Sequence, residues 1–152
     1  MIKAFLLGVL LTFGVMATLW KTGRIPASPQ PGASPLSVKG DTCAGKKFCV
    51  VAYLAPWCPY CKAEVSSIQR MIEKSQTGEV GIRVVVGMER APGQNAQMAN
   101  GIAKDILLDT NLAISNKYGI HAIPAFVVTD QNGEKVMDGQ QGRQWTADRI
   151  GG

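Results

Sequence analysis

The sequence predicts an α/β domain in which helices flank a mixed central sheet. Two nearly continuous apolar runs, Lys47–Leu54 and Val80–Gly87, are typical of strands that are buried on both faces. Between them, apolar residues recur with helical spacing from Pro59 up to Gly78. Nearer the C-terminus, a turn sequence at 130–133 separates two short extended segments, as in a β-hairpin. The order strand, helix, strand implies parallel pairing, and the hairpin adds antiparallel pairing, so we expect one mixed sheet.

The remaining elements are shorter, and their patterns are less regular. We expect a loop leading into a short helix at Met88–Asn100, an extended stretch at Ile106–Leu108, and a short helix at Asn111–Tyr118 that stops at Gly119. The two hairpin strands are expected at Ala125–Thr129 and Glu134–Met137, and a C-terminal piece of one or two helical turns at Trp145–Ile150.

A charge-free apolar segment, residues 4–20, lies at the N-terminus. As a helix it would measure about 25 Å at roughly 1.5 Å per residue, which is the short limit for crossing a bilayer. We therefore predict a single N-terminal hydrophobic helix at 1–21 that is either a signal-anchor or a cleaved signal peptide. Trp20 at the membrane interface favours the anchor, whereas the small-residue sequence at 15–17 offers a cleavage site. A buried helix of a soluble domain is the third alternative.

The next segment, Thr22–Asp41, is rich in proline, serine, alanine and glycine. Such a composition buries too little apolar surface to order itself, and proline keeps it extended. We predict a proline-rich linker at 22–41 followed by a folded domain at 42–152. Half of the prolines of the chain lie in this linker: Pro26, Pro29, Pro31 and Pro35.

The positive charge of the chain is concentrated before the predicted domain. The whole chain carries a net charge of +5, but residues 42–152 hold twelve basic and ten acidic residues, a net of only +2. Lysines and arginines do not alternate with aromatic residues in any stripe, so we expect no nucleic-acid binding.

The sequence Trp57-Cys58-Pro59-Tyr60-Cys61 lies where the first buried strand meets the following helix. Cys58 would cap this helix, with Pro59 at its first position. Unpaired backbone N–H groups and the helix dipole favour an anion there, and the thiolate is the form of cysteine that attacks disulfides. Cys61, one turn later on the same side, can resolve the mixed disulfide. The pattern predicts a redox-active pair.

Two other interpretations of this pair are less favoured. A zinc site would need a second pair of ligands with matching spacing. The only histidine is His121, and the other cysteines, Cys43 and Cys49, have five residues between them. A purely structural bridge between Cys58 and Cys61 would close a small loop and stabilise little. We expect no metal and no cofactor.

From Phe48 to Gly142 the chain resembles thioredoxin. The matching sequences are V-V-A-Y-L-A-P-W-C-P-Y-C-K, K-Y-G-I-H-A-I-P-A-F and D-Q-N-G-E-K-V followed by Gly139. The resemblance implies a thioredoxin fold and catalysis by Cys58 and Cys61. Family members place a cis-proline opposite the cysteine pair, and here Pro124 fits that position. The substrate contacts that we expect are Trp57, Pro59, Tyr60 and Ile123.

This sequence also departs from thioredoxin. Thioredoxins carry a buried aspartate six residues before the first cysteine, where this chain has Ala52. Glu64 instead resembles the glutamate of membrane-tethered thioredoxins that serve cytochrome c maturation. We expect a half-buried carboxylate there to pass protons for Cys61; the alternative is a solvated helix residue. The C-P-Y-C tetrad is that of glutaredoxins, which are cytosolic and lack Trp57.

Several other residues keep more than one interpretation. Cys43 and Cys49 flank a turn-like loop, and they form a structural disulfide, a second redox pair that relays electrons, or two free thiols. His121 is a surface residue, or it lies at the rim of the site and contacts the substrate or tunes a pKa there. Trp57 covers the rim of the site or packs into the core. Tyr118 and Trp145 are expected to pack.

We predict a thiol–disulfide oxidoreductase that acts on exported proteins, and within that class a reductase. The domain then lies in the periplasm, tethered to the bacterial inner membrane through residues 4–20, or is periplasmic or secreted if that segment is cleaved. Its partners are protein thiols and disulfides of exported clients and an upstream electron donor or acceptor. The alternative is a binding module that holds a copper ion or a client peptide without turnover. Related copper chaperones, however, use a wider C-x-x-x-C and a downstream histidine.

Overall fold

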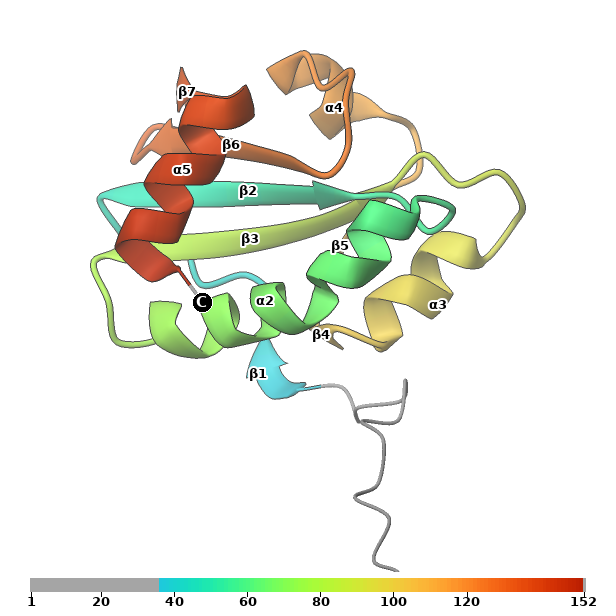
Figure 1. Ribbon diagram of the computed structural model, residues 1–152, viewed down its shortest axis with the longest axis horizontal. Coiled ribbons are helices and arrows are strands. Elements are labelled where there is room, and N and C mark those ends of the chain that lie inside the picture. Colours follow the sequence, from blue (N-terminus) through green and yellow to red (C-terminus); the bar gives the residue numbers. More distant parts are fainter. Residues whose placement is uncertain (1–35, 152) are drawn as a thin grey trace, which may run out of the picture. The chain divides into compact units, whose positions relative to one another are not determined.

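A five-stranded mixed sheet organises the part of the chain that the computed structural model describes, residues 36–151 (Figure 1). The predicted helix at 1–21 lies outside these residues, and within them no helix combines the length and apolar character that a membrane crossing requires. The strands lie in the order β5 (Leu107–Asp109), β3 (Val80–Gly87), β2 (Phe48–Leu54), β6 (Ala125–Asp130) and β7 (Lys135–Met137).

Strand β2 is the centre of the sheet, and the prediction of two buried strands is confirmed. β2 pairs in parallel with β3, with Val50 opposite Ile82, and antiparallel with β6, with Val51 opposite Val127. Every residue of β2 after Phe48 is buried. This agrees with its sequence, which contains no charged residue, because a strand covered on both faces is apolar along its whole length. The α/β class with a mixed sheet is therefore confirmed.

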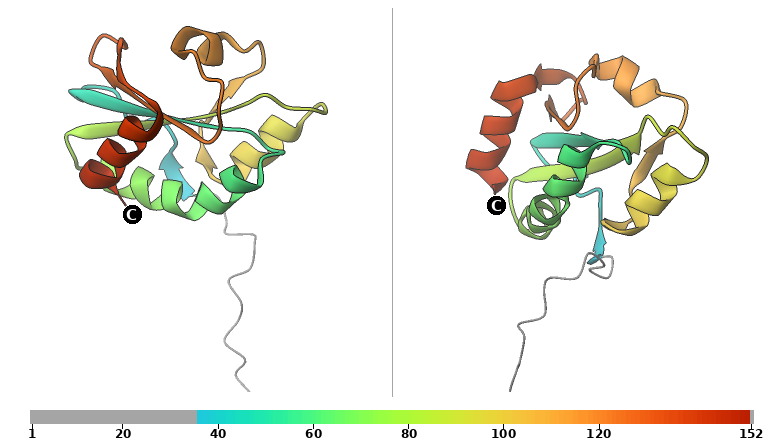
Figure 2. Two further views of the ribbon diagram at one scale, coloured as in Figure 1. Left: turned by 45° about the horizontal axis from the view of Figure 1, so that its top comes forward. Right: turned by 45° about the vertical axis from the view of Figure 1, so that its right-hand side comes forward.

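Helices cover both faces of the sheet (Figure 2). On one face, Ala52 and Leu54 pack in a core with Ile68 of α2, and α3 and α5 add residues to the same cluster. On the other face, Val51 and Tyr53 pack under α4. The helices are α2 (Pro59–Ser75), α3 (Gln94–Asn100), α4 (Ala113–Tyr118) and α5 (Gly139–Ile150). Gly119 ends α4 with a left-handed φ of 66°.

The linker predicted at 22–41 includes, at its C-terminal end, residues that belong to a strand. Residues Leu36–Lys39 form strand β1, which pairs in parallel with β4 (Ala103–Lys104). Gly40 continues this pairing because its N–H donates to the Lys104 carbonyl and its own carbonyl accepts the Val84 N–H. Asp41 forms an ion pair of 2.7 Å with Arg83. The prolines of the predicted linker end at Pro35, so residues 36–41 keep the N–H groups that a strand needs.

The C-terminal helix is longer than the one or two turns predicted at Trp145–Ile150. It begins at Gly139. Its early residues are mainly glycines and glutamines, and because they show no apolar period, the sequence pattern did not indicate a helix there. Gly142 lies so close to the Phe126 carbonyl that a Cβ would collide with it. The Thr146 hydroxyl donates to the Gly142 carbonyl at 2.6 Å. The missing side chain therefore lets α5 pack directly on β6.

A buried polar network ties β2 to β5 and α4. The Tyr53 hydroxyl donates to Asp109 Oδ2 at 2.9 Å, and the backbone N–H groups of Ile114 and Ser115 donate to the same carboxylate. Burial, together with the hydrogen bond to Asp109, raises the pKa of Tyr53, so the hydroxyl keeps the proton that it donates.

We expect Tyr53→Phe to destabilise the domain by about 1.5–3 kcal/mol, the range for a lost hydrogen bond to a carboxylate. Tyr118→Phe is the matched control, because its hydroxyl bonds only a backbone carbonyl, that of Gly133, at 3.3 Å. That variant should lose about 0.5–1.5 kcal/mol. Urea unfolding of both variants measures the difference in the free energy of unfolding. Equal losses of stability would show that the hydrogen bond from Tyr53 to Asp109 stabilises the domain no more than the one from Tyr118 to Gly133.

Candidate functional site

The end of β2 and the start of α2 hold Cys58 at a helix N-terminus. Its N–H donates to the Ala55 carbonyl at 3.1 Å, and its carbonyl accepts the Lys62 N–H at 3.2 Å. Cys58 caps α2, and its sulfur accepts the Cys61 N–H at 3.4 Å. The first turn of α2 contains no acidic residue. The cap therefore directs N–H groups and the positive end of the helix dipole at the Cys58 sulfur.

Cys61 shares this turn but occupies a different environment. It is fully buried, whereas Cys58 retains 3% exposure. Burial, and then the hydrogen bond and charge of Cys58, raise the pKa of Cys61 to about 12. Both cysteines are free thiols in this structure. The geometry thus pairs a nearly buried sulfur at the helix cap with a fully buried thiol that holds its proton at neutral pH.

The segment before β6 completes the site from the other side. The bond between Ile123 and Pro124 is cis, and the Cys58 thiol donates to the Ile123 carbonyl at a sulfur–oxygen distance of 3.9 Å. The antiparallel pairing of β2 with β6 places Ala125 opposite Tyr53, so the residues before Ala125 continue toward the cysteines. Ile123, Pro124 and Ala125 are all partly exposed, so an approaching chain can reach this edge.

Trp57, Pro59 and Tyr60 form the rim around Cys58. Trp57 is half-buried and packs against the core cluster of the α2 face, so it both contributes to the core and borders the site. Its indole N–H donates to the Met88 carbonyl at 2.6 Å. The guanidinium of Arg90 lies 3.8 Å from the centre of its ring. Pro59 is exposed, and Tyr60 is 74% exposed.

Glu64 lies on α2 one turn beyond Cys61 and is partly buried. Its carboxylate forms an ion pair with the guanidinium of Arg143 on α5, and the two side chains are 20% and 50% exposed, respectively. Ala52, which replaces the aspartate of thioredoxins, is fully buried in the core cluster that also contains Cys61.

Sequence analysis did not identify Met88, Arg90 or Arg143 as neighbours of the site. Each contact joins residues that are distant in the chain: Arg143 lies 79 positions after Glu64, and Met88 lies 31 after Trp57. No local pattern of residues signals such contacts.

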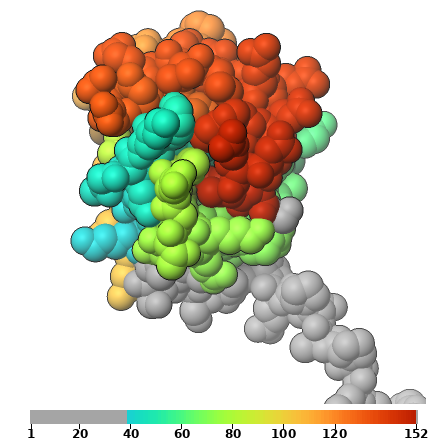
Figure 3. All heavy atoms as spheres, turned by 90° about the vertical axis from the view of Figure 1, so that its left-hand side faces the viewer, coloured from blue at the N-terminus to red at the C-terminus, as the bar shows by residue number. Residues whose placement is uncertain are grey.

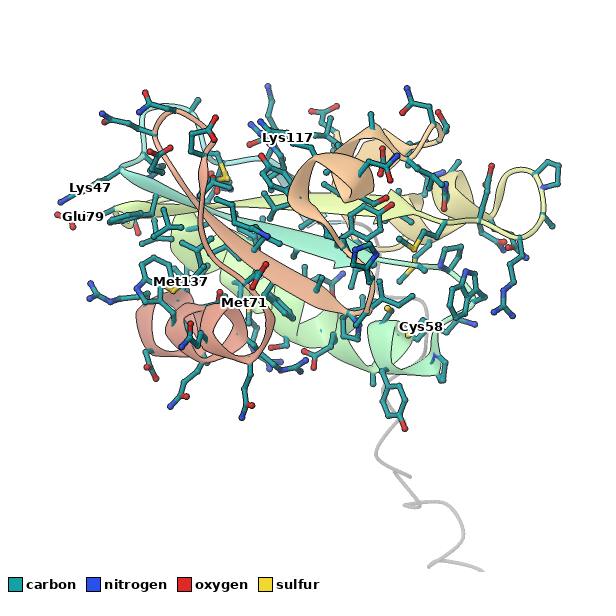
Figure 4. All side chains as sticks on the ribbon, turned by 90° about the horizontal axis from the view of Figure 1, so that it is seen from above. Lys47, Cys58, Met71, Glu79, Lys117 and Met137 are labelled. Atoms are coloured by element: carbon teal, nitrogen blue, oxygen red, sulfur yellow. A yellow bond between two sulfur atoms is a disulfide. The ribbon has the colours of Figure 1, made fainter. Side chains whose placement is uncertain are left out.

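Cys43 and Cys49 form a disulfide at the opposite end of β2, with their Cα atoms 5.3 Å apart. At roughly 3.3 Å per strand residue, Cys49 lies about 17 Å from Leu54, and Cys58 follows still further along the chain. Direct exchange between the two cysteine pairs is excluded by that distance. Figure 4 shows the separation, with Lys47 and Cys58 at opposite ends of the strand.

One hollow lies at the Cys43–Cys49 disulfide, and another lies beside Pro124. The wider one, about 1360 Å³, is lined by Cys43, Cys49 and several charged residues. It occurs at the end of the sheet where β2 begins, the end that faces the viewer in Figure 3. A smaller hollow of about 470 Å³ is bordered by Pro124, Phe126 and His121, which is exposed. Within residues 36–151, His, Cys, Asp and Glu side chains form no group of three that could hold a metal ion.

The model of the Redoxin family matches residues 22–149, most of the chain. The chain belongs to the Redoxin family. Solved structures of other proteins are similar to this fold. StoA from Bacillus subtilis is 20% identical, with a TM-score of 0.51, and the match covers 68% of this redoxin and 83% of StoA.

Two further structures share the fold at similar levels. The exposed lipoprotein thioredoxin Etrx1 of Streptococcus pneumoniae is 20% identical, with a TM-score of 0.50 over 61% of this redoxin and 73% of Etrx1. A secreted disulfide oxidoreductase of Mycobacterium tuberculosis is 20% identical, with a TM-score of 0.50 over 74% and 82% of the two chains. No curated protein sequence matches the chain.

Family and fold together identify the chain as a thioredoxin-like protein and a thiol–disulfide oxidoreductase. The structures, at these identities, establish the fold, and the family establishes the class of chemistry. This redoxin has one cysteine pair at a helix N-terminus and one at the far end of the sheet.

We expect iodoacetamide to label Cys58 before Cys61 in the reduced, folded protein between about pH 5 and about pH 9. A raised pKa keeps Cys61 in the thiol form until the pH approaches about 12, and only the thiolate reacts. Mass mapping of labelled peptides over a pH series measures the order. In denaturant, where burial is lost, both cysteines should label alike. Earlier labelling of Cys61 in the folded protein would contradict this assignment.

Proposed function

We propose that this redoxin reduces disulfides of exported proteins through Cys58 and Cys61. One observation carries the proposal: Cys58 caps α2 with its sulfur 3.9 Å from the Ile123 carbonyl, beside a buried Cys61 thiol. The cap stabilises a negative sulfur, and the partly exposed edge at Ile123 gives a client chain access to it.

In the first step, the Cys58 thiolate attacks one sulfur of the client disulfide. The client S–S bond breaks, a mixed disulfide between Cys58 and the client forms, and the released client thiolate takes a proton from water. An extended client segment lies along Ile123 and over the rim of Trp57, Pro59 and Tyr60. No side-chain acid is needed at this step, because the leaving sulfur is released to solvent.

In the second step, Cys61 gives up its proton and attacks the Cys58 sulfur. The Cys58–Cys61 disulfide forms, and the client leaves with its second thiol, so the client gains two electrons and two protons. Because burial keeps Cys61 protonated, this step needs a base, and Glu64 one turn away is the carboxylate that we assign to it. A thiol donor then reduces the Cys58–Cys61 disulfide and restores the starting state.

The proposal places the domain outside the cytoplasm. Residues 4–20 provide the predicted export segment, and a disulfide such as Cys43–Cys49 persists in oxidising compartments. The similar structures include an exposed lipoprotein and a secreted oxidoreductase, which supports the same location. Tethering through residues 4–20 is part of this proposal, as is the bacterial inner membrane as its site.

A binding module for copper or a client peptide is the second candidate. Its support is limited to the exposed edge at Ile123 and Pro124, which could hold a peptide without any turnover. Copper has less support, because within residues 36–151 no third His, Cys, Asp or Glu side chain joins Cys58 and Cys61 in a group that could hold a metal ion. A binding module would leave the thiol content of a bound client unchanged, and a reductase would raise it.

The reduction potential of the Cys58–Cys61 couple tests the direction of the reaction. We expect a value nearer to about −270 mV, as in thioredoxin, than to about −120 mV, as in a strong oxidant such as DsbA. Equilibration with dithiothreitol or glutathione buffers, read by thiol trapping, measures it. Cys58→Ser is the control, since it removes this couple and leaves Cys43–Cys49. A potential near the oxidant value would overturn the reductase assignment.

A comparison of Glu64→Gln with Arg143→Gln distinguishes a role of Glu64 in proton transfer from the effect of losing its ion pair with Arg143. Both variants lose the same ion pair, which is only partly buried and contributes about 1 kcal/mol to stability. If Glu64 accepts the Cys61 proton, Glu64→Gln alone should slow resolution of the mixed disulfide, by about 10²-fold. Stopped-flow measurement of that step decides, and equal small effects in the two variants would leave Glu64 a structural residue.

A further inference from the structure

The loop between β3 and α3 is built around Trp57. The Met88 carbonyl, held by a left-handed φ of 57°, accepts the Trp57 indole N–H at 2.6 Å. Further along, the Gln94 side-chain oxygen accepts the N–H groups of Arg90 and Ala91, both at 3.2 Å. These hydrogen bonds hold the backbone of Arg90 next to the tryptophan that precedes the reactive cysteine.

Arg90 stacks on Trp57 and keeps its charge exposed. The guanidinium lies 3.8 Å from the ring centre, and the residue is exposed to solvent. A guanidinium that stacks by its face still presents N–H donors at its edge, in the geometry that binds a carboxylate. No acidic side chain of residues 36–151 forms an ion pair with Arg90. The carboxylate of neighbouring Glu89 accepts the Asn95 N–H instead, at 3.1 Å.

A second cation follows the cysteine pair directly. Lys62 is exposed in the first turn of α2, and no acid in the described part of the chain pairs with it. The first turn of α2 carries no acidic residue, and Glu64 in the next turn is paired with Arg143. Arg90 and Lys62 are therefore two exposed cations without an ion-pair partner among the described residues, although the predicted domain is close to neutral and Glu89 beside Arg90 is also exposed.

We propose that Arg90, assisted by Lys62, selects clients that carry an aspartate or glutamate within a few residues of the disulfide to be reduced. This selection rests on the proposed function. Trp57 is adjacent to Cys58, so a client whose sulfur reaches Cys58 brings its neighbouring side chains over the stacked guanidinium. The client carboxylate accepts hydrogen bonds from Arg90, while Tyr60 offers an exposed ring beside them.

The selection acts on the encounter and on the formation of the mixed disulfide. Rim charges mainly change association rates, and their effect weakens as salt screens them. The later attack by Cys61 involves no contact between Arg90 and the attacking sulfur, so we expect the selection in the first step.

Two synthetic peptides test the proposal. Each contains one internal disulfide, and the two differ only in a glutamate or a lysine two residues after the attacked cysteine. The second-order rate of reduction by the full-length reduced protein is measured for both peptides at low and at physiological ionic strength. The wild type should favour the glutamate peptide by about fivefold at low salt, the scale of one exposed ion pair, and by less at higher salt.

Four variants separate charge from packing. Arg90→Gln should reduce the preference to about twofold or less, Arg90→Lys should retain most of it, and Lys62→Gln should lower it partially. Lys47→Gln is the matched control, because it removes the same charge at the other end of β2 and should leave the preference unchanged (Figure 4).

Three results would overturn the selection by Arg90. They are equal wild-type rates with both peptides, an unchanged preference in Arg90→Gln, and a loss in Lys47→Gln as large as in Arg90→Gln. Equal slowing of both peptides by Arg90→Gln, with Arg90→Lys no better, would show that Arg90 only supports Trp57. Failure of the wild type to reduce either peptide would contradict the proposed function itself.

Discussion

The antiparallel register between β2 and β6 determines where the two halves of the site meet. With Tyr53 opposite Ala125, the chain that leaves β2 toward Cys58 and the chain that enters β6 from Ile123 lie at the same edge of the sheet. A slip by one residue would move Phe126 and Val128 out of the core on the α2 face and Val127 out of the core under α4, and the packing of both cores opposes it. The contact between the Cys58 sulfur and the Ile123 carbonyl therefore depends on strand pairing.

Within that frame, one turn of helix gives two identical side chains different chemistry. Cys58 is the cap and lies where N–H groups and the helix dipole converge, whereas Cys61 points into the apolar core shared with Ile68. Apolar surroundings disfavour the charged sulfur of Cys61, and its hydrogen bond from the Ala55 N–H offsets only part of this effect. The order of the two steps in the proposed mechanism follows from this asymmetry.

Local patterns predicted what depends on neighbours in the chain: the two buried strands, the start of α2 at Cys58 and the stop of α4 at Gly119. Contacts between distant segments carried no such pattern, and they include Arg90 on Trp57. Helix α5 was underestimated for a related reason. Its first turns rely on the close approach of Gly142 to β6, and backbone packing leaves no apolar period in the sequence. The two central strands and the helix cap at Cys58 thus depend on local sequence, whereas the rim of the site is a tertiary feature.

The length of β2 also keeps the two cysteine pairs independent. Cys49 is buried at the start of the strand, and its carbonyl accepts the Thr129 hydroxyl of β6 at 3.2 Å, so its bridge to Cys43 is held by sheet pairing on both sides. Cys58 lies beyond the other end, where the sheet gives way to a loop and a helix cap. A disulfide inside a paired strand resists the backbone movement that exchange requires, while a cysteine at a cap meets a partner without disturbing the sheet. The two ends of β2 therefore hold one cysteine pair suited to stability and, under the proposed function, another suited to turnover.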